Sequence, residues 1–190
     1  MKIGVYVGSF DPVHKAHMEV VNHVTENNYV DKVVIIPTHS YWNKKQLTDI
    51  KNRIAMLKFY ENNNIIINTT LNSVPYTYQI LNALKEQYQN DELYLIIGAD
   101  NIEKFHLWKE VDKILENKIL VLPRNRIDVY KYIEKFKQKK QFIFVENFNV
   151  QFISSTAIRN MILTDNYQEI NGFLDENVLK YILDNNLYKN

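Results

Sequence analysis

Six short apolar runs alternate with segments of helical spacing, and this alternation constrains the fold more than any other feature of the chain. The runs are rich in Ile, Val and Leu, which is typical of strands buried on both faces of a sheet. Strands that alternate with helices predict a parallel, doubly wound α/β sheet with right-handed crossovers. The predicted strands are residues 3–7, 32–37, 65–68, 93–98, 118–123 and 141–145.

Helical spacing fills the gaps between these strands, and only helices are predicted after the last one. The sequence has no linker rich in Pro, Gly or Ser, no low-complexity tract and no repeat. A length of 190 residues suits one domain with a full hydrophobic core. We therefore predict a single domain over residues 1–190, with the C-terminal helices packed on the same core. The predicted helices are residues 15–28, 49–61, 76–89, 101–116, 128–138, 155–163 and 175–186.

Cysteine content and net charge limit the classes of function. The chain has no cysteine, which excludes disulfide frameworks, thiolate zinc sites and cysteine nucleophiles. Its net charge of +1 gives no support for nucleic acid or an anionic membrane as a partner, so an anion site must be local. The sequence shows no secretory leader and no apolar segment of membrane-spanning length, so a cytoplasmic location is expected.

The stretch GSFDPVHKAH, residues 8–17, connects the first predicted strand to the first predicted helix. Gly8 allows a tight turn, and Asp11 with the proline after it can shape the entry into the helix. His14 and His17 share one face near the positive end of that helix. Imidazoles and free amides placed there could bind a phosphate chain. The same residues also fit a satisfied turn with two surface histidines or, more weakly, a metal site.

A second candidate anion site is ISSTAIR, residues 153–159. Ser154 or Ser155 can cap the helix that follows, and Arg159 projects one turn later. Taken alone, this segment is an ordinary capped helix. Two such helix starts in one α/β sheet favour phosphate binding. The sequence contains neither the dinucleotide-binding motif GxGxxG nor the P-loop motif GxxxxGK[ST], so a bound nucleotide would need these helix starts instead.

Two further segments follow predicted strands, where ligands bind in open α/β sheets. After the second strand, Lys44 or Lys45 could neutralise phosphate charge or could be solvated loop residues.

After the fourth strand, the segment GADNIEKFHLW offers groups for a nucleoside. Gly98 and Asp100 could bond a ribose. Trp108 could stack on a flat ring or lie in the core.

These motifs, in this order, resemble the nucleotidylyltransferase superfamily with its HxGH-type and ISSTxIR-type motifs. More narrowly, the chain resembles bacterial-type nicotinate mononucleotide adenylyltransferases over nearly its whole length. GSFDPVHKAH matches GxFDPxHxGH except at Ala16, VPYTYQIL resembles the helix start that contains SYT, and the GAD segment and C-terminal tail have counterparts. The loop PTHSYWNKK differs from the bacterial PPHK loop and is similar to the lysine loop of eukaryotic nicotinamide mononucleotide adenylyltransferases.

The resemblance implies a Rossmann-like nucleotidylyltransferase fold and transfer of the adenylyl group of ATP to nicotinate mononucleotide. It implies Mg²⁺ bound mainly through the ATP phosphates, with no protein metal ligand. The implied partners are the two substrates, without nucleic acid or membrane, and whether the chain forms a homo-oligomer is left open. The implied catalytic residues are His14, His17, Lys44 and Arg159. The implied ATP-binding residues are Gly8, Ser9, Phe10, Asp11, His14, His17, Ser154, Ser155, Thr156 and Arg159. The implied mononucleotide-binding residues are Thr77, Gly98, Asp100 and Trp108.

Several other functions are compatible with parts of the sequence. The acceptor could be nicotinamide mononucleotide, or both pyridine nucleotides. Another superfamily member would act on phosphopantetheine, FMN or glycerol 3-phosphate, which the GADN segment and Trp108 disfavour. A nucleotide-binding domain without activity is disfavoured by the intact His14, His17 and Arg159. A mononuclear metalloenzyme lacks a third clustered ligand.

Overall fold

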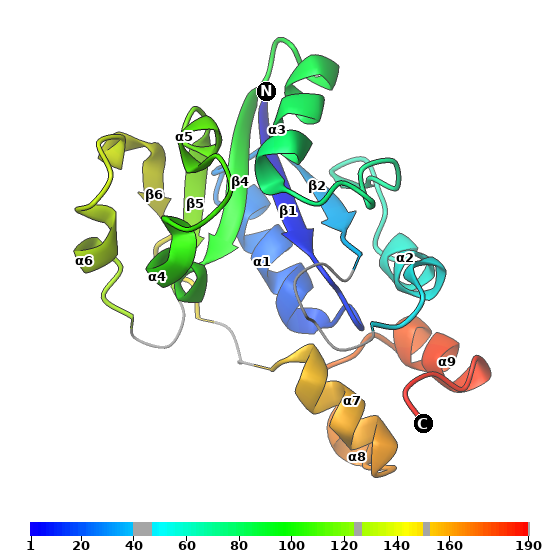
Figure 1. Cartoon of the computed structure of the whole chain (residues 1–190). Coiled ribbons are helices and arrows are strands. Elements are labelled where there is room, and N and C mark those ends of the chain that lie inside the picture. The colour runs from blue at the N-terminus through cyan, green and yellow to red at the C-terminus, as the bar shows by residue number, and fades with distance from the viewer. Residues whose placement is uncertain (40–46, 124–126, 150–152, 190) are drawn as a thin grey trace.

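The computed structural model describes residues 1–39, 47–123, 127–149 and 153–189. In this part of the chain six parallel strands form one sheet in the order β3-β2-β1-β4-β5-β6 (Figure 1). The order reverses between β1 and β4, so the predicted doubly wound fold is confirmed. The strands are β1 Lys2–Gly8, β2 Lys32–Pro37, β3 Ile65–Ile67, β4 Glu92–Gly98, β5 Lys118–Leu122 and β6 Phe142–Phe144, each within two residues of its prediction.

Helices cover both faces of the sheet because successive strand side chains point to opposite faces. Ile35 of β2 joins one buried cluster, whereas its neighbour Val34 joins the other. The first cluster includes residues of α1 (Lys15–Glu26), α2 (Ile50–Lys58), α7 (Ser155–Leu163), α8 (Tyr167–Ile170) and α9 (Glu176–Asp184). The second includes residues of α3 (Thr77–Gln87), α4 (Ile102–Phe105), α5 (Val111–Ile114) and α6 (Tyr130–Ile133).

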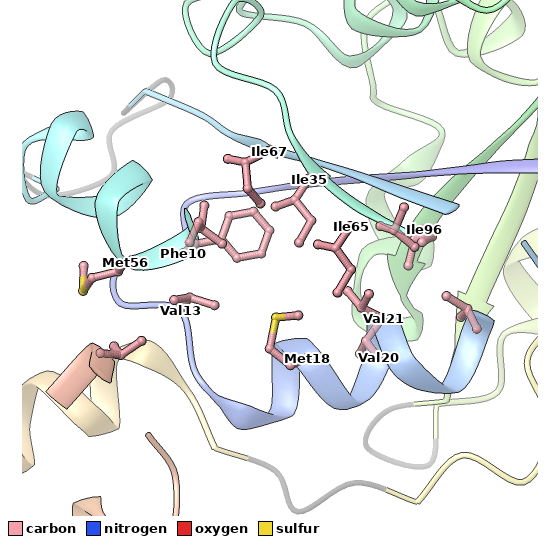
Figure 2. Packing of buried hydrophobic residues seen from close by; sticks show 14 of the residues in the cluster. Phe10, Val13, Met18, Val20, Val21, Ile35, Met56, Ile65, Ile67 and Ile96 are labelled. Carbon is pink, nitrogen blue, oxygen red and sulfur yellow. The ribbon is translucent and has the colours of Figure 1, made fainter. Parts of the chain in front are cut away.

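The first cluster anchors α1 and the loop before it (Figure 2). Met18 and Val21 point from α1 toward the isoleucines of the sheet, and Phe10 lies among them. A side chain at Gly4 of β1 would place its Cβ 2.9 Å from Cδ1 of Ile96, so glycine leaves room for that side chain of the cluster. The packing therefore fixes where α1 begins, which is where the two histidines lie.

The predicted helix over residues 101–116 is wrong as a continuous element. The structure has the 3-10 turn η1 (Ala99–Asn101), then α4 and α5 with an irregular segment between them. Glu110 adopts a left-handed conformation with φ 51°, which a continuing α-helix does not allow. Apolar residues recur at intervals of three or four from Ile102 to Leu115, which is the spacing typical of a helix, so the apolar pattern did not reveal the break.

The predicted helix over residues 128–138 is shorter than expected, and α8 was not predicted. Only α6 is helical in the first segment, which continues through turns and the 3-10 turn η2 (Lys139–Gln141) into β6. One helical turn and the turn after it already bury Val129, Ile133 and Phe136. The remaining residues up to β6 have few apolar side chains to bury, so nothing selects a longer helix.

Candidate active site

Two cavities flank the carboxyl end of β1, at the switch point of the sheet. The larger has a volume of about 520 Å³ and the smaller about 250 Å³. Val7 and Gly8 line the larger cavity, whereas Tyr6 lines the smaller one. Because neighbouring residues of β1 face opposite sides, two ligands could approach the end of this strand from its two sides.

The loop after β1 has a constrained backbone. Phe10 has a left-handed conformation with φ 47°, which is uncommon for a bulky residue and costs roughly 1–3 kcal/mol. Its ring is 2% exposed and makes edge contacts with the rings of Tyr6 and His17, at centroid distances of 5.3 and 5.0 Å. A Cβ at Gly8 would lie 3.0 Å from this ring. Phe10 therefore contributes its side chain to the core, and Gly8 leaves room for that ring.

Arg53 of α2 holds this loop against the one that follows β2. Its side chain is 1% exposed, and Nη1 donates to the carbonyl oxygens of Ser9 at 2.6 Å and Thr38 at 2.8 Å. Nε donates to the carbonyl oxygen of Thr48 at 2.9 Å. Burial lowers the pKa of the guanidinium below its ordinary value, and the negative charge of Asp11 opposes that shift. One buried arginine thus fixes both loops at the mouth of the larger cavity.

His14 and His17 lie together at the start of α1 and line the smaller cavity. Their rings stack at a centroid distance of 3.7 Å and an interplanar angle of 23°. The backbone N–H of His14 donates to Nδ1 of His17 at 3.2 Å. Because Nδ1 accepts a hydrogen bond, a neutral His17 carries its proton on Nε2.

The second motif packs directly on the first, although the two lie more than 140 residues apart. Ser154 caps α7, with Oγ accepting from the N–H of Ala157 at 3.1 Å. Ser155 Oγ donates to the carbonyl oxygen of Pro12 at 2.9 Å. Nη1 of Arg159 donates to the carbonyl oxygen of Asp11 at 2.7 Å, and Nη2 to the hydroxyl of Thr156 at 3.2 Å. The starts of α1 and α7 therefore form one positively polarised site around the smaller cavity.

The larger cavity has mainly apolar walls and an aromatic side. Trp108 is half-buried there, with its ring 5.0 Å from that of Phe105. Thr77 lies at the start of α3, which has no side-chain cap. Among the lining residues that the structure describes there is one Lys or Arg side chain, Lys109, and no carboxylate.

The chain matches the model of the cytidylyltransferase-like family over residues 5–161. It belongs to that family.

Relatives of this family match the chain along its whole length. A probable nicotinate-nucleotide adenylyltransferase of Borrelia hermsii (strain HS1 / DAH) is 34% identical over 194 residues, covering 99% of this chain and 98% of the relative. One from Flavobacterium johnsoniae (strain UW101) is also 34% identical and covers all of both chains. The structure of Plasmodium falciparum nicotinic acid mononucleotide adenylyltransferase complexed with NaAD has a TM-score of 0.83 at 26% identity. That comparison covers 98% of this chain and 97% of the other.

More than half of the site residues predicted from the sequence line one of the two cavities. Thr77 and Trp108 line the larger one, whereas Gly98 lines the smaller one beside the histidines. Asp100 is exposed and is not among the described residues that line either cavity. Lys44 and Lys45 lie outside the described residues.

Asp11, which the sequence predicts to shape the turn and the resemblance implies to bind ATP, has its carboxylate directed into the protein. It is 2% exposed, with Oδ1 accepting from the hydroxyl of Tyr188 at 2.7 Å and Oδ2 from the N–H of Thr48 at 3.2 Å. Its carboxylate is thus engaged within the protein.

Three residues near the site were not predicted from the sequence in the roles that the structure gives them. They are Arg53, which bonds the backbone of both loops, Lys109 and Tyr188. The position of Lys109 directly after Trp108 was the one available signal.

In the described ranges no group of three or more His, Asp or Glu side chains could hold a metal ion. The same ranges contain no helix with the length and apolar character needed to cross a membrane.

Proposed function

We propose that this chain transfers the adenylyl group of ATP to nicotinate mononucleotide, forming nicotinate adenine dinucleotide and releasing pyrophosphate. The observation that carries the proposal is the pair of cavities on either side of the end of β1. One has groups suited to phosphates, and the other has an aromatic wall suited to a flat ring. The full-length relatives named for this activity and the structural neighbour complexed with NaAD support it.

ATP would occupy the smaller cavity. The starts of α1 and α7 present amides, the Nε2–H of His17 and the side chains around Arg159, which suit the triphosphate. Gly8, Ser9 and Phe10 would shape the loop beneath it. The proposed contacts of Ser154, Ser155 and Thr156 are with the outer phosphates, and Lys44 would assist.

The mononucleotide would occupy the larger cavity. Its pyridine ring would stack on Trp108, and the ring carboxylate would lie near Thr77 and the uncapped amides that begin α3. Lys109 adds positive charge on the same cavity, which favours a carboxylate over a neutral amide. Asp100 would contact the ribose, whereas Gly98 lines the smaller cavity and would therefore lie on the ATP side of β1.

The chemistry needs positioning and charge stabilisation rather than a nucleophilic side chain. An oxygen of the mononucleotide 5′-phosphate would attack the α-phosphorus of ATP in line, forming one P–O bond. The bond between the α-phosphorus and the bridging oxygen would break, and its electron pair would leave with pyrophosphate. His17, with His14 stacked on it, would stabilise the negative charge that builds up on the α-phosphoryl oxygens.

Magnesium would enter with ATP. Both carboxylate oxygens of Asp11 already accept hydrogen bonds within the protein, so the described residues around the histidines suit phosphate oxygens better than a divalent cation. Mg²⁺ commonly keeps several waters and binds substrate phosphates, where it neutralises charge. We propose that the enzyme is cytoplasmic and that its two substrates are small molecules.

The test is pyrophosphate release from Mg-ATP with nicotinate mononucleotide, nicotinamide mononucleotide, phosphopantetheine and FMN as parallel acceptors. We expect the highest kcat/KM with nicotinate mononucleotide. Equal rates with the two pyridine nucleotides would make the enzyme dual-specific. Activity only with phosphopantetheine or FMN, or with none of the four, would overturn the proposal.

A further inference from the structure

The C-terminal tail reaches the loop that carries the nucleotide motif. Tyr188 donates its hydroxyl hydrogen to Oδ1 of Asp11 at 2.7 Å, across 177 residues of sequence. To place this side chain the tail turns through left-handed conformations at Asn186 (φ 49°) and at Tyr188 itself (φ 65°). Such a conformation is uncommon for an aromatic residue and persists only where its surroundings hold it.

Asp11 links that hydroxyl to Arg159 of α7, the helix whose first residues line the smaller cavity. Its other carboxylate oxygen accepts from the N–H of Thr48, and its backbone carbonyl accepts from Nη1 of Arg159. Asp11 is buried, so water cannot replace a lost partner at low cost. Burial first, then the charge of Asp11, raises the pKa of the Tyr188 hydroxyl, which keeps it protonated as a donor.

We propose that Tyr188 is a positioning residue for ATP: through Asp11 it holds the loop and the guanidinium of Arg159 in the geometry that binds the triphosphate. This inference rests on the proposed function for the identity of the nucleotide. Tyr188 lines neither cavity among the described residues, so it acts through Asp11 rather than on the ligand.

Tyr181 provides a matched control from the same end of the chain. Its hydroxyl donates to Oδ1 of Asn52 at 3.0 Å, so it joins α9 to α2 as Tyr188 joins the tail to the loop. Neither Tyr181 nor Asn52 lines a cavity in the described structure. Removing each hydroxyl therefore deletes a tertiary hydrogen bond made from the C-terminal end of the chain, to a carboxylate at Tyr188 and to a neutral amide at Tyr181, but only Tyr188 touches the nucleotide loop.

The experiment compares Tyr188→Phe, Tyr181→Phe and the unmodified chain. Calorimetry measures the Kd of Mg-ATP without an acceptor, and pyrophosphate release gives KM for ATP and for the mononucleotide. Assays run well below each protein's unfolding midpoint. Because a hydrogen bond to a charged group is lost, we expect Tyr188→Phe to raise the Kd and KM for ATP about 10-fold. The mononucleotide KM should change less than about twofold, and Tyr181→Phe should change none of the three constants by more than that.

Asp11→Asn tests the same hydrogen bond from its other end and does not depend on Tyr188→Phe folding. It should also weaken ATP binding, and in its background Tyr188→Phe should have a much smaller further effect on the Kd. An unchanged ATP Kd in either single variant, or fully additive effects in the double variant, would overturn the inference. So would an equal loss in Tyr181→Phe. Because the Kd is measured without an acceptor, a failure of every acceptor would reject the proposed function while leaving this comparison decisive.

Discussion

His17 uses its two ring nitrogens differently, and this allows its two roles to be separated. Nδ1 accepts from the backbone of His14 and thereby helps to begin α1, whereas Nε2 is left as the donor. Asparagine can place an acceptor near Nδ1 but has nothing at Nε2. We expect His17→Asn and His17→Ala both to lower kcat by about 10²- to 10³-fold, as loss of a transition-state donor does. Only His17→Ala should also lower the unfolding temperature.

His23 gives the control for that pair, since it lies in the same helix and lines neither cavity in the described structure. Its Nε2 lies 3.1 Å from the carbonyl oxygen of Glu146. Steady-state kinetics of His23→Asn should match those of the unmodified chain. Near-normal turnover in His17→Asn would contradict the role assigned to Nε2.

Lys109 should tune the choice between the two pyridine nucleotides. Among the described residues that line the larger cavity, Lys109 is the one Lys or Arg. Its side chain is exposed, so water and salt screen its attraction to a ring carboxylate. We expect Lys109→Met to raise KM for nicotinate mononucleotide about 2- to 5-fold and to leave that for nicotinamide mononucleotide nearly unchanged. Lys104→Met, an exposed change in α4, is the control. Equal shifts for both acceptors would show that the charge of Lys109 plays no part in selection.

Sequence reasoning reached the residues whose chemistry is local. His14 and His17 follow a strand and begin a helix, and Ser154 with Arg159 repeat that arrangement, so their meeting followed from the fold class. Lys109 could not be singled out, because nothing in the sequence says which way a lysine beside Trp108 points.

At the scale of elements, strands were easier to predict than the short helices. A buried parallel strand needs only a run of β-branched and apolar residues, and such runs are distinct in this chain. The break between α4 and α5 depends on the left-handed backbone of Glu110. Nothing in the sequence around Glu110 indicates that conformation. That break exposes Leu107 and places Trp108 and Lys109 on the larger cavity, so the missed feature is also the functional one.

The helix α2 serves the site through one buried residue, Arg53, which bonds three carbonyl oxygens on two loops. Methionine fills similar space but donates nothing, so those oxygens lose their charged donor. We expect Arg53→Met to lower the free energy of unfolding by about 3 kcal/mol and to weaken ATP binding. Arg53→Lys should recover only part of either loss, because an ammonium cannot reproduce the planar fork.

Denaturant unfolding and calorimetry with Mg-ATP measure the two effects of Arg53. Lys51→Met, an exposed substitution in the same helix, should leave both quantities unchanged. Full recovery by Arg53→Lys would mean that charge alone holds the loops.

At the scale of the whole molecule, the first and last segments close on each other. The loop after β1 meets α7 through Ser155 and Arg159 and the tail through Tyr188. The general plan of two helix starts at one switch point followed from the order of strands and helices. The contact of Tyr188 with Asp11 did not, because it depends on the path of a tail whose turns the sequence does not specify.

The packing of the C-terminal helices also buries the hydroxyl of Tyr60, and burial without a hydrogen bond is unfavourable for stability. Tyr60 follows α2 and packs on the cluster that α9 completes, and its hydroxyl oxygen is buried without a hydrogen-bond partner among the described residues. Burial, and then the charge of Asp175, raises the pKa of this hydroxyl well above its ordinary value near 10. Below pH 10 the hydroxyl is protonated in both the folded and unfolded states and adds no pH dependence.

Above pH 10 only the unfolded state loses the Tyr60 proton. The free energy of unfolding should therefore fall by up to about 1.4 kcal/mol per pH unit from this residue. We expect Tyr60→Phe to remove that dependence in urea unfolding between pH 10 and 11, and at pH 7 to be neutral or stabilising, because no hydrogen bond is lost. Tyr188→Phe should also reduce the alkaline dependence but should destabilise at pH 7, since Oδ1 of Asp11 loses its hydroxyl donor. The exposed Tyr130 supplies the control, and Tyr130→Phe should change neither quantity. A clear loss of stability in Tyr60→Phe at pH 7 would show that its hydroxyl is satisfied in solution.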